Sequence, residues 1–150
     1  MSKKIIQYNA GKDYLYYYYR FVILPWELEW SQEKFIKKKG SLDSYCKNKN
    51  ISIKSFASAE KLKYALTHEY QNIENSFNGV LWFVRSDTVP KDILRHLRNC
   101  FAHGNFQMRQ KNKIKCIFIK NINSNTIKAQ GFIPVDEIRG LVESAKTCLC

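Results

Sequence analysis

The residues best suited to chemistry lie together in segment 94–106, which reads LRHLRNCFAHGNF. Arg98, Asn99 and His103 come at the end of a predicted helix, and Gly104 follows them. A histidine exchanges protons near neutral pH, so His103 can serve as a general base or a general acid. The planar guanidinium of Arg98 suits phosphoryl oxygens. The pair therefore fits proton transfer beside a phosphate group.

The spacing of these residues separates them from the apolar positions of the helix. At about 100° per residue, one arc of segment 92–103 is apolar and must face the core. We expect the opposite arc to point away from the core, with His96 exposed. This arc holds Asp92, Arg95, His96, Arg98, Asn99, Ala102 and His103.

Arg98 and His103 would not touch within one straight helix, because their spacing places them roughly 140° apart around the axis. Asn99 and His103 are neighbours on the helix surface. The small Ala102 lies between them and Arg98 on the polar arc, where it lets another helix approach. We therefore expect the same helix of a second subunit, packed across a two-fold axis, to complete the site. A solvated helix end is the competing interpretation, since the pattern R-x-x-x-x-H alone is weak.

The stretch RNCFAHG, residues 98–104, resembles the signature of the HEPN superfamily. Leu97, Ala102 and Gly104 also match its common form, LRNxxAHG. The resemblance implies a small, usually dimeric helical bundle that acts as a metal-independent endoribonuclease, as a toxin of a toxin–antitoxin pair or a phage-defence effector. It implies Arg98 and His103 as the catalytic pair and Asn99 as the polar residue of the motif. The alternative is a non-catalytic HEPN-like dimer that binds RNA or protein.

The chemistry of RNA cleavage agrees with these residue types. RNA carries its own nucleophile, the 2′-hydroxyl, so cleavage needs a base, an acid for the leaving 5′-oxygen and positive charge beside the phosphorane. Two subunits supply two copies of His103, enough for both proton transfers. We expect no metal and no cofactor, and products that carry a 2′,3′-cyclic phosphate or 3′-phosphate and a 5′-hydroxyl.

The charge of the chain favours a polyanionic partner. Its formal net charge is +12, although most of its cations are lysines, as composition bias alone can produce. We expect RNA as the partner, contacted by Arg95 and by a basic hairpin that contains Arg109, Lys111 and Lys113. A solvated turn that protects a sheet edge is an equally good interpretation of that hairpin. An antitoxin or regulatory protein is a further expected partner.

Length and composition bound the remaining possibilities. A chain of 150 residues, 45% of them hydrophobic, suits a single domain over 1–150. Five irregularly spaced cysteines and no secretory signal predict reduced thiols and a cytoplasmic location. The most apolar run, 14–24, is too short and too polar to cross a membrane. A membrane-surface protein would need a basic amphipathic helix with an exposed apolar face, and no clear one is present.

The periodicity predicts a mainly α fold, a HEPN-like helical bundle with a small antiparallel β-hairpin or meander before the C-terminal helix. Residues 41–55 read as a loop that follows a helix stop at Gly40, and 80–84 fits either a helix or a buried strand. The predicted strands are 106–110, 113–120 and 126–133. The predicted helices are 12–24, which Pro25 interrupts, then 26–39, 58–77 and 90–103, and a last one that opens at 134.

Overall fold

The computed structural model describes residues 18–34 and 40–148. The first part is helical: a π-helical turn (Tyr19–Ile23), α2 (Leu24–Leu28) and a 3-10 turn (Trp30–Gln32). The elements that follow are α3 (Gly40–Lys49), β1 (Ile51–Phe56), α4 (Ala59–His68), α5 (Tyr70–Glu74), β2 (Gly79–Val84), α6 (Val89–Ala102), β3 (Phe106–Lys111), β4 (Ile114–Asn123), β5 (Thr126–Pro134) and α7 (Val135–Lys146).

The described strands form one five-stranded sheet in the order β1-β2-β5-β4-β3. The β1–β2 pair is parallel, and the crossover between these two strands carries α4 and α5. The pairs β2–β5, β5–β4 and β4–β3 are antiparallel. The prediction of a mainly α bundle with a small meander is therefore wrong, because the meander is part of a mixed sheet and the fold is α+β.

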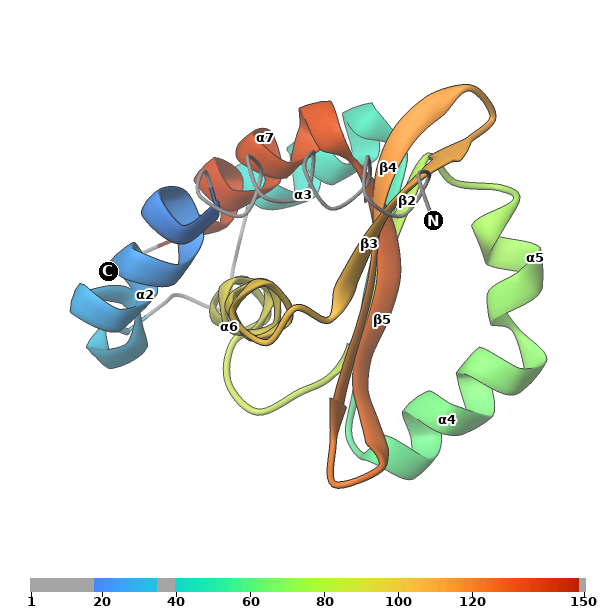
Figure 1. Ribbon diagram of the computed structural model, residues 1–150, viewed down its shortest axis with the longest axis horizontal. Helices are drawn as coiled ribbons and strands as arrows, with labels where there is room; N and C mark the ends of the chain where they lie inside the picture. Colours follow the sequence, from blue (N-terminus) through green and yellow to red (C-terminus); the bar gives the residue numbers. More distant parts are fainter. Residues whose placement is uncertain (1–17, 35–39, 149–150) are drawn as a thin grey trace, which may run out of the picture.

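Two helical layers enclose this sheet, which Figure 1 shows edge-on. Helices α4 and α5 cover one face, while α3, α6 and α7 cover the other, with α2 packed outside α6. The strand β2 contributes to both cores, because successive side chains point to opposite faces. Leu81 and Phe83 pack toward α6 and α7, and Val80 and Trp82 pack toward α4 and α5.

The buried position of β2 explains why its sequence was ambiguous. The strand GVLWFV is apolar on both faces, so it lacks the alternation that identifies a half-exposed strand. Residues 41–55, predicted as a loop, form most of α3 and β1 instead. Gly40, predicted to stop a helix, is the first residue of α3, and the residues just before it lie outside the described ranges. Pro25 lies in the first turn of α2, where proline is tolerated.

The remaining predicted helices and strands agree with the structure to different degrees. The predicted helix 58–77 is divided into α4 and α5, with Ser58 capping α4 by accepting a hydrogen bond from the Lys61 backbone N–H at 3.2 Å. The helix 90–103, the three C-terminal strands and the last helix are confirmed within a few residues. Parts of the predicted helices 12–24 and 26–39 lie outside the described residues. Within the described ranges, no helix has the length and apolar character that a membrane crossing requires.

Candidate functional site

The ends of α6 explain where the motif lies. Thr88 precedes the helix and Pro90 occupies its first turn, where a missing N–H costs nothing. At the other end, Gly104 adopts a φ of +68°, and the backbone N–H of Asn105 donates to the Cys100 carbonyl at 2.8 Å. This left-handed ending favours glycine because it has no Cβ. His103 is thus the last residue before the turn, with its side chain exposed.

The apolar arc of α6 is buried as predicted, but its polar arc is not uniformly exposed. Asp92 has no exposed surface, and its carboxylate accepts hydrogen bonds from the backbone N–H groups of Ser86 and Asp87 at 2.9 and 3.0 Å. Arg95 donates to the same carboxylate at 3.0 Å. The helix α6 is flanked on two sides, by β2 and by the segment around Trp26. Some side chains outside its apolar arc are therefore buried as well. Asp92 therefore anchors the 86–87 turn.

His96 is also buried, with 5% of its surface exposed, so the prediction that it is exposed is wrong. Its Nε2–H donates to the Val84 carbonyl at 3.2 Å, and its Nδ1 accepts from the Asn121 amide at 3.4 Å. Burial lowers the pKa of His96 below its ordinary value of 6.5, because the imidazolium loses its hydration. His96 is therefore a neutral imidazole with its proton on Nε2, a link between β2, α6 and β4.

Arg98 points to the α2 side of the helix. One terminal nitrogen of the guanidinium donates to Asn99 Oδ1 at 2.8 Å, and the other pairs with the Glu27 carboxylate on α2. Its Nε–H is buried and has no hydrogen-bond partner among the described residues. The three motif side chains therefore have different surroundings. Arg98 is paired with Glu27, Asn99 accepts a hydrogen bond from Arg98, and His103 is exposed.

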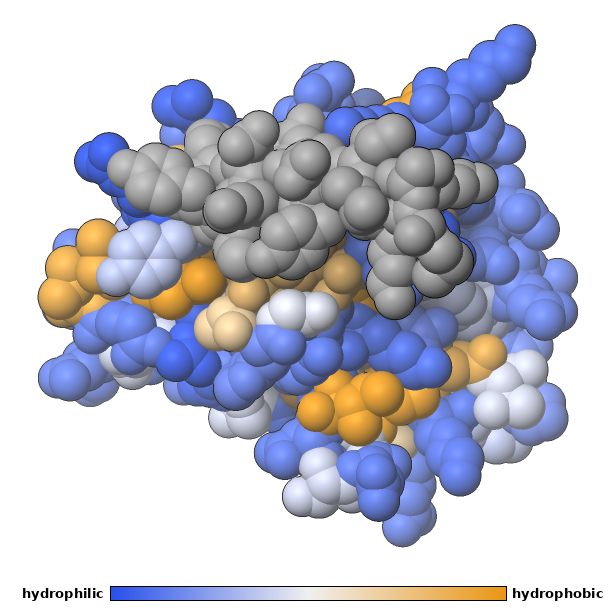
Figure 2. Space-filling view, viewed as in Figure 1, coloured by the Kyte–Doolittle hydropathy of each residue, from blue (hydrophilic) through white to orange (hydrophobic). Residues whose placement is uncertain are grey.

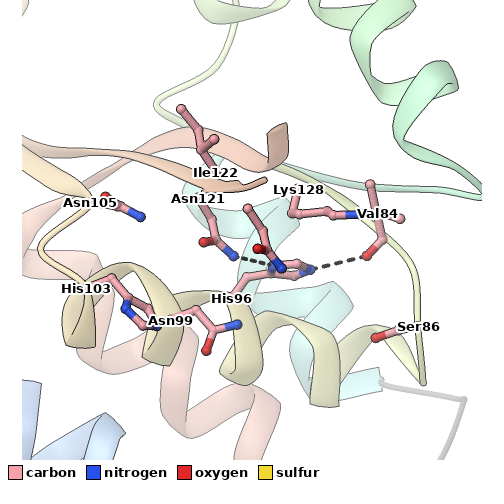
Figure 3. A pocket seen from close by; sticks show the side chains of 10 residues that line it. Val84, Ser86, His96, Asn99, His103, Asn105, Asn121, Ile122 and Lys128 are labelled. Atoms are coloured by element: carbon pink, nitrogen blue, oxygen red, sulfur yellow. Dashed lines mark hydrogen bonds between the residues drawn. The ribbon is translucent and has the colours of Figure 1, made fainter. Parts of the chain in front are cut away.

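A polar cavity of about 550 Å³ opens beside the C-terminal half of α6 (Figure 3). Asn99 and His103 line it from the helix, whereas Arg98 is not among its lining residues. The cavity therefore brings two motif residues together and leaves Arg98 on the adjoining flank. His96 of the same helix also lines the cavity. The other lining residues come from the end of β2, the turn after it, the segment after Gly104 and the β4–β5 hairpin: Val84, Ser86, Asn105, Asn121, Ile122, Asn123 and Lys128.

The predicted RNA-binding cations lie in different settings. Arg95 is held by Asp92 and Ser86 and lies over the Trp26 ring at 5.5 Å, so its guanidinium already has structural partners. The other three lie on or beside β3, away from the cavity that His103 lines. Arg109 and Lys111 lie over the rings of Phe118 and Phe132, each at 4.5 Å, and Lys113 is exposed in the turn between β3 and β4.

A second cavity, of about 540 Å³, connects this basic strand to the end of the motif. Its lining includes Gly104 and Asn105 after the motif, Arg109 of β3 and Lys120 of β4. Asn105 lines both cavities. The sequence did not identify Asn105, Asn121, Asn123 or Lys128 as site residues, because asparagines around 121–125 are also typical of a turn. Among the described residues, no group of three or more His, Cys, Asp or Glu side chains is placed to hold a metal ion.

Comparison with known proteins gives one match. The family model described as HEPN pEK499 p136 matches residues 2–149, almost the whole chain. This match confirms the resemblance that residues 97–104 carry. No curated protein and no solved structure matches the chain.

Proposed function

Because the chain belongs to the HEPN pEK499 p136 family, we propose that it is a metal-independent endoribonuclease of the HEPN type. Membership itself suggests a nuclease or another function that involves RNA. The proposed catalytic residues are Arg98 and His103, with Asn99 as the residue that positions Arg98. The proposed biological role is that of a toxin or a phage-defence effector in the cytoplasm.

The observation that carries this proposal is the setting of His103. Its exposed imidazole lies at the edge of a cavity that no Asp or Glu of the described residues lines. An approaching phosphate therefore meets amides, a histidine and Lys128 and no carboxylate, which suits an anionic substrate.

The proposed reaction is an internal transfer at phosphorus. One His103 takes the proton of the 2′-hydroxyl, and the 2′-oxygen attacks the phosphorus while the bond to the 5′-oxygen breaks. A second His103 gives its proton to the departing 5′-oxygen. The charge that develops on the nonbridging oxygens is stabilised by Arg98, whose guanidinium can bind two of them. The products are a 2′,3′-cyclic phosphate and a 5′-hydroxyl.

Two features support a homodimer as the active form. Arg98 and His103 face different sides of α6 in one chain, so a second copy of α6 would bring each residue close to its counterpart. Ala102 on α6 is exposed and is a small side chain that permits close helix approach, and Leu28 of α2 is 76% exposed. Figure 2 shows apolar surface over α2 on a mostly hydrophilic molecule. An apolar patch of this kind suits burial against a partner.

The test is an RNA cleavage assay in the presence of EDTA. We expect wild type to cleave, and His103→Ala and Arg98→Ala each to lose at least about a hundredfold in rate. His68→Ala, which changes an exposed histidine on α4, is the matched control and should cleave like wild type. Light scattering and circular dichroism must show that all variants keep the same oligomeric state and fold.

Retained cleavage by both motif variants would overturn the proposed site. A wild-type protein that binds RNA without cleaving it would favour the second candidate, a non-catalytic HEPN-like dimer. That candidate also draws on a specific contact, because Glu27 already neutralises Arg98 in the single chain. An antitoxin or regulatory protein that displaces or reinforces this contact remains part of the proposal, and co-purification from the native host would test it.

A further inference from the structure

The cavity beside His103 is lined by four asparagines, and we call it the asparagine pocket. Its amides belong to Asn99, Asn105, Asn121 and Asn123, which come from α6, the segment after it and β4. Its volume of about 550 Å³ lies inside the range of roughly 300–1,000 Å³ typical of small-ligand sites. Lys128 is the only Lys or Arg among its lining residues in the described part of the chain.

The amide of Asn121 has a fixed orientation. His96 donates its Nε2 proton to the Val84 carbonyl, so its Nδ1 can only accept, and the group it faces must be the NH₂ of Asn121. Asn121 Oδ1 consequently lies on the side of the amide turned away from His96 (Figure 3). Burial of Asn121, at 7% exposure, holds this arrangement. One Nδ2 hydrogen is used by His96, and the second is left for a ligand.

Among the described residues, Asn121 Oδ1 accepts no hydrogen bond. The free edge of this amide therefore presents one acceptor and one donor side by side. A nucleobase edge that carries an adjacent donor and acceptor satisfies both at once. In protein–nucleic acid complexes an Asn amide makes this two-point contact with adenine, by accepting from N6 and donating to N7.

The other common base contacts are poorly served here. Guanine is read most often by the fork of an Arg and cytosine by a carboxylate acceptor. No Asp, Glu or Arg of the described residues lines the pocket. Asn99 Oδ1 accepts from Arg98 at 2.8 Å, and the NH₂ group on the side of the pocket adds donors. These donors suit the ribose and phosphate oxygens that accompany a bound base.

We propose that the asparagine pocket binds an adenine of the RNA substrate, with Asn121 as the residue that reads the base. This proposal rests on the proposed ribonuclease function and names the nucleotide that lies beside His103. His96 is a positioning residue in it, since it acts on the base through the Asn121 amide. The pocket then places an adenosine next to the bond that is cut.

The test measures binding of nucleotides to the full chain by calorimetry. The probes are the four ribonucleoside 5′-monophosphates and 7-deazaadenosine 5′-monophosphate, which keeps N6 but lacks the N7 acceptor. We expect AMP to bind at least about tenfold more tightly than the other three, and the 7-deaza analogue to lose about fivefold or more. Asn121→Ala should remove the difference between the nucleotides. Asn48→Ala, which changes an exposed asparagine on α3, should leave it intact.

The outcomes separate this proposal from the proposed function. Equal affinity for the four nucleotides, preference for another base, or equal binding of AMP and its 7-deaza analogue would each overturn the adenine site, even if the protein cleaves RNA. Selective AMP binding without RNA cleavage would support the adenine site and overturn the nuclease. The comparison of AMP with its analogue uses wild type only, so an Asn121→Ala protein that fails to fold does not affect the result.

Discussion

The buried imidazole of His96 predicts how the stability of the fold depends on pH. In the folded protein His96 is neutral, because burial opposes the charged form and lowers the pKa. The hydrogen bond to the Val84 carbonyl and the charge of Asp92 raise the pKa, whereas Arg95 and Lys128 lower it, and the effect of burial is the largest. In the unfolded chain the same residue titrates with its ordinary pKa of 6.5.

The direction of the effect follows from proton binding. Above pH 6.5 both states hold a neutral imidazole, and His96 contributes no pH dependence. As the pH falls through the unfolded value, the unfolded state binds a proton that the folded state does not, so stability falls. The slope cannot exceed about 1.4 kcal/mol per pH unit, so the loss between about pH 7 and about pH 5.5 is at most about 1 kcal/mol. The loss ends below the lowered folded pKa.

The assay is urea unfolding of wild type, His96→Gln and His68→Gln across this pH range. Gln keeps an amide that can donate to the Val84 carbonyl but cannot bind a proton. The His96→Gln protein should therefore be less stable overall, and its stability should depend less on pH, by up to about 1 kcal/mol over this range. His68→Gln, at an exposed position of α4, should reproduce the slope of wild type. Equal slopes for wild type and His96→Gln would refute the reasoning, because a charged folded His96 would then be tolerated.

Two further predictions concern the ends of α6. Asp92→Ala removes the acceptor of the 86–87 turn, so the free energy of unfolding should fall by about 2–3 kcal/mol. Calorimetry should show this as a Tm lower by roughly 4–12 °C. The control Asp136→Ala, at an exposed position, should lose well below 1 kcal/mol. Gly104→Ala should cost about 1 kcal/mol in urea unfolding because φ is +68°, and Gly104→Asn should cost less. Equal values for Ala and Asn would exclude a backbone origin.

Sequence patterns predicted the C-terminal half of the fold better than the N-terminal half. The helix that ends at Gly104 and the last helix carry amphipathic periods and clear end signals. The strand β1 reads ISIKSF, a short segment whose sheet partner, β2, lies 23 residues later in the chain. Nothing local distinguishes such an edge strand from a loop, because its stability comes from pairing and from the α4–α5 crossover that covers it.

The site residues that the sequence identified belong to a local motif, and those that it missed depend on tertiary contacts. His103, Asn99 and Arg98 were identified because a local motif contains them, and their catalytic roles stay predictions. Asn121 was missed because its position depends on the pairing of β4 with β5, which includes an irregularity between Asn121 and Ile122. His96 was misplaced because a one-sided helical wheel does not describe a helix enclosed between a sheet and α2.

Two histidines of the same segment differ in their expected roles: His96 of α6 stabilises the fold, whereas His103 at the end of the helix is proposed to act in catalysis. His96 joins the end of β2 to β4 through two hydrogen bonds, so the pocket wall depends on the same contacts that satisfy a buried polar group. Changes at His96 or Asn121 should therefore affect both unfolding and nucleotide preference. His103 follows Phe101, the last buried residue of α6, by two positions and is exposed, and none of the hydrogen bonds of the pocket wall involves its imidazole. His103→Ala should thus remove cleavage while the unfolding free energy stays within about 0.5 kcal/mol of wild type, and a large loss of stability would assign His103 a structural role.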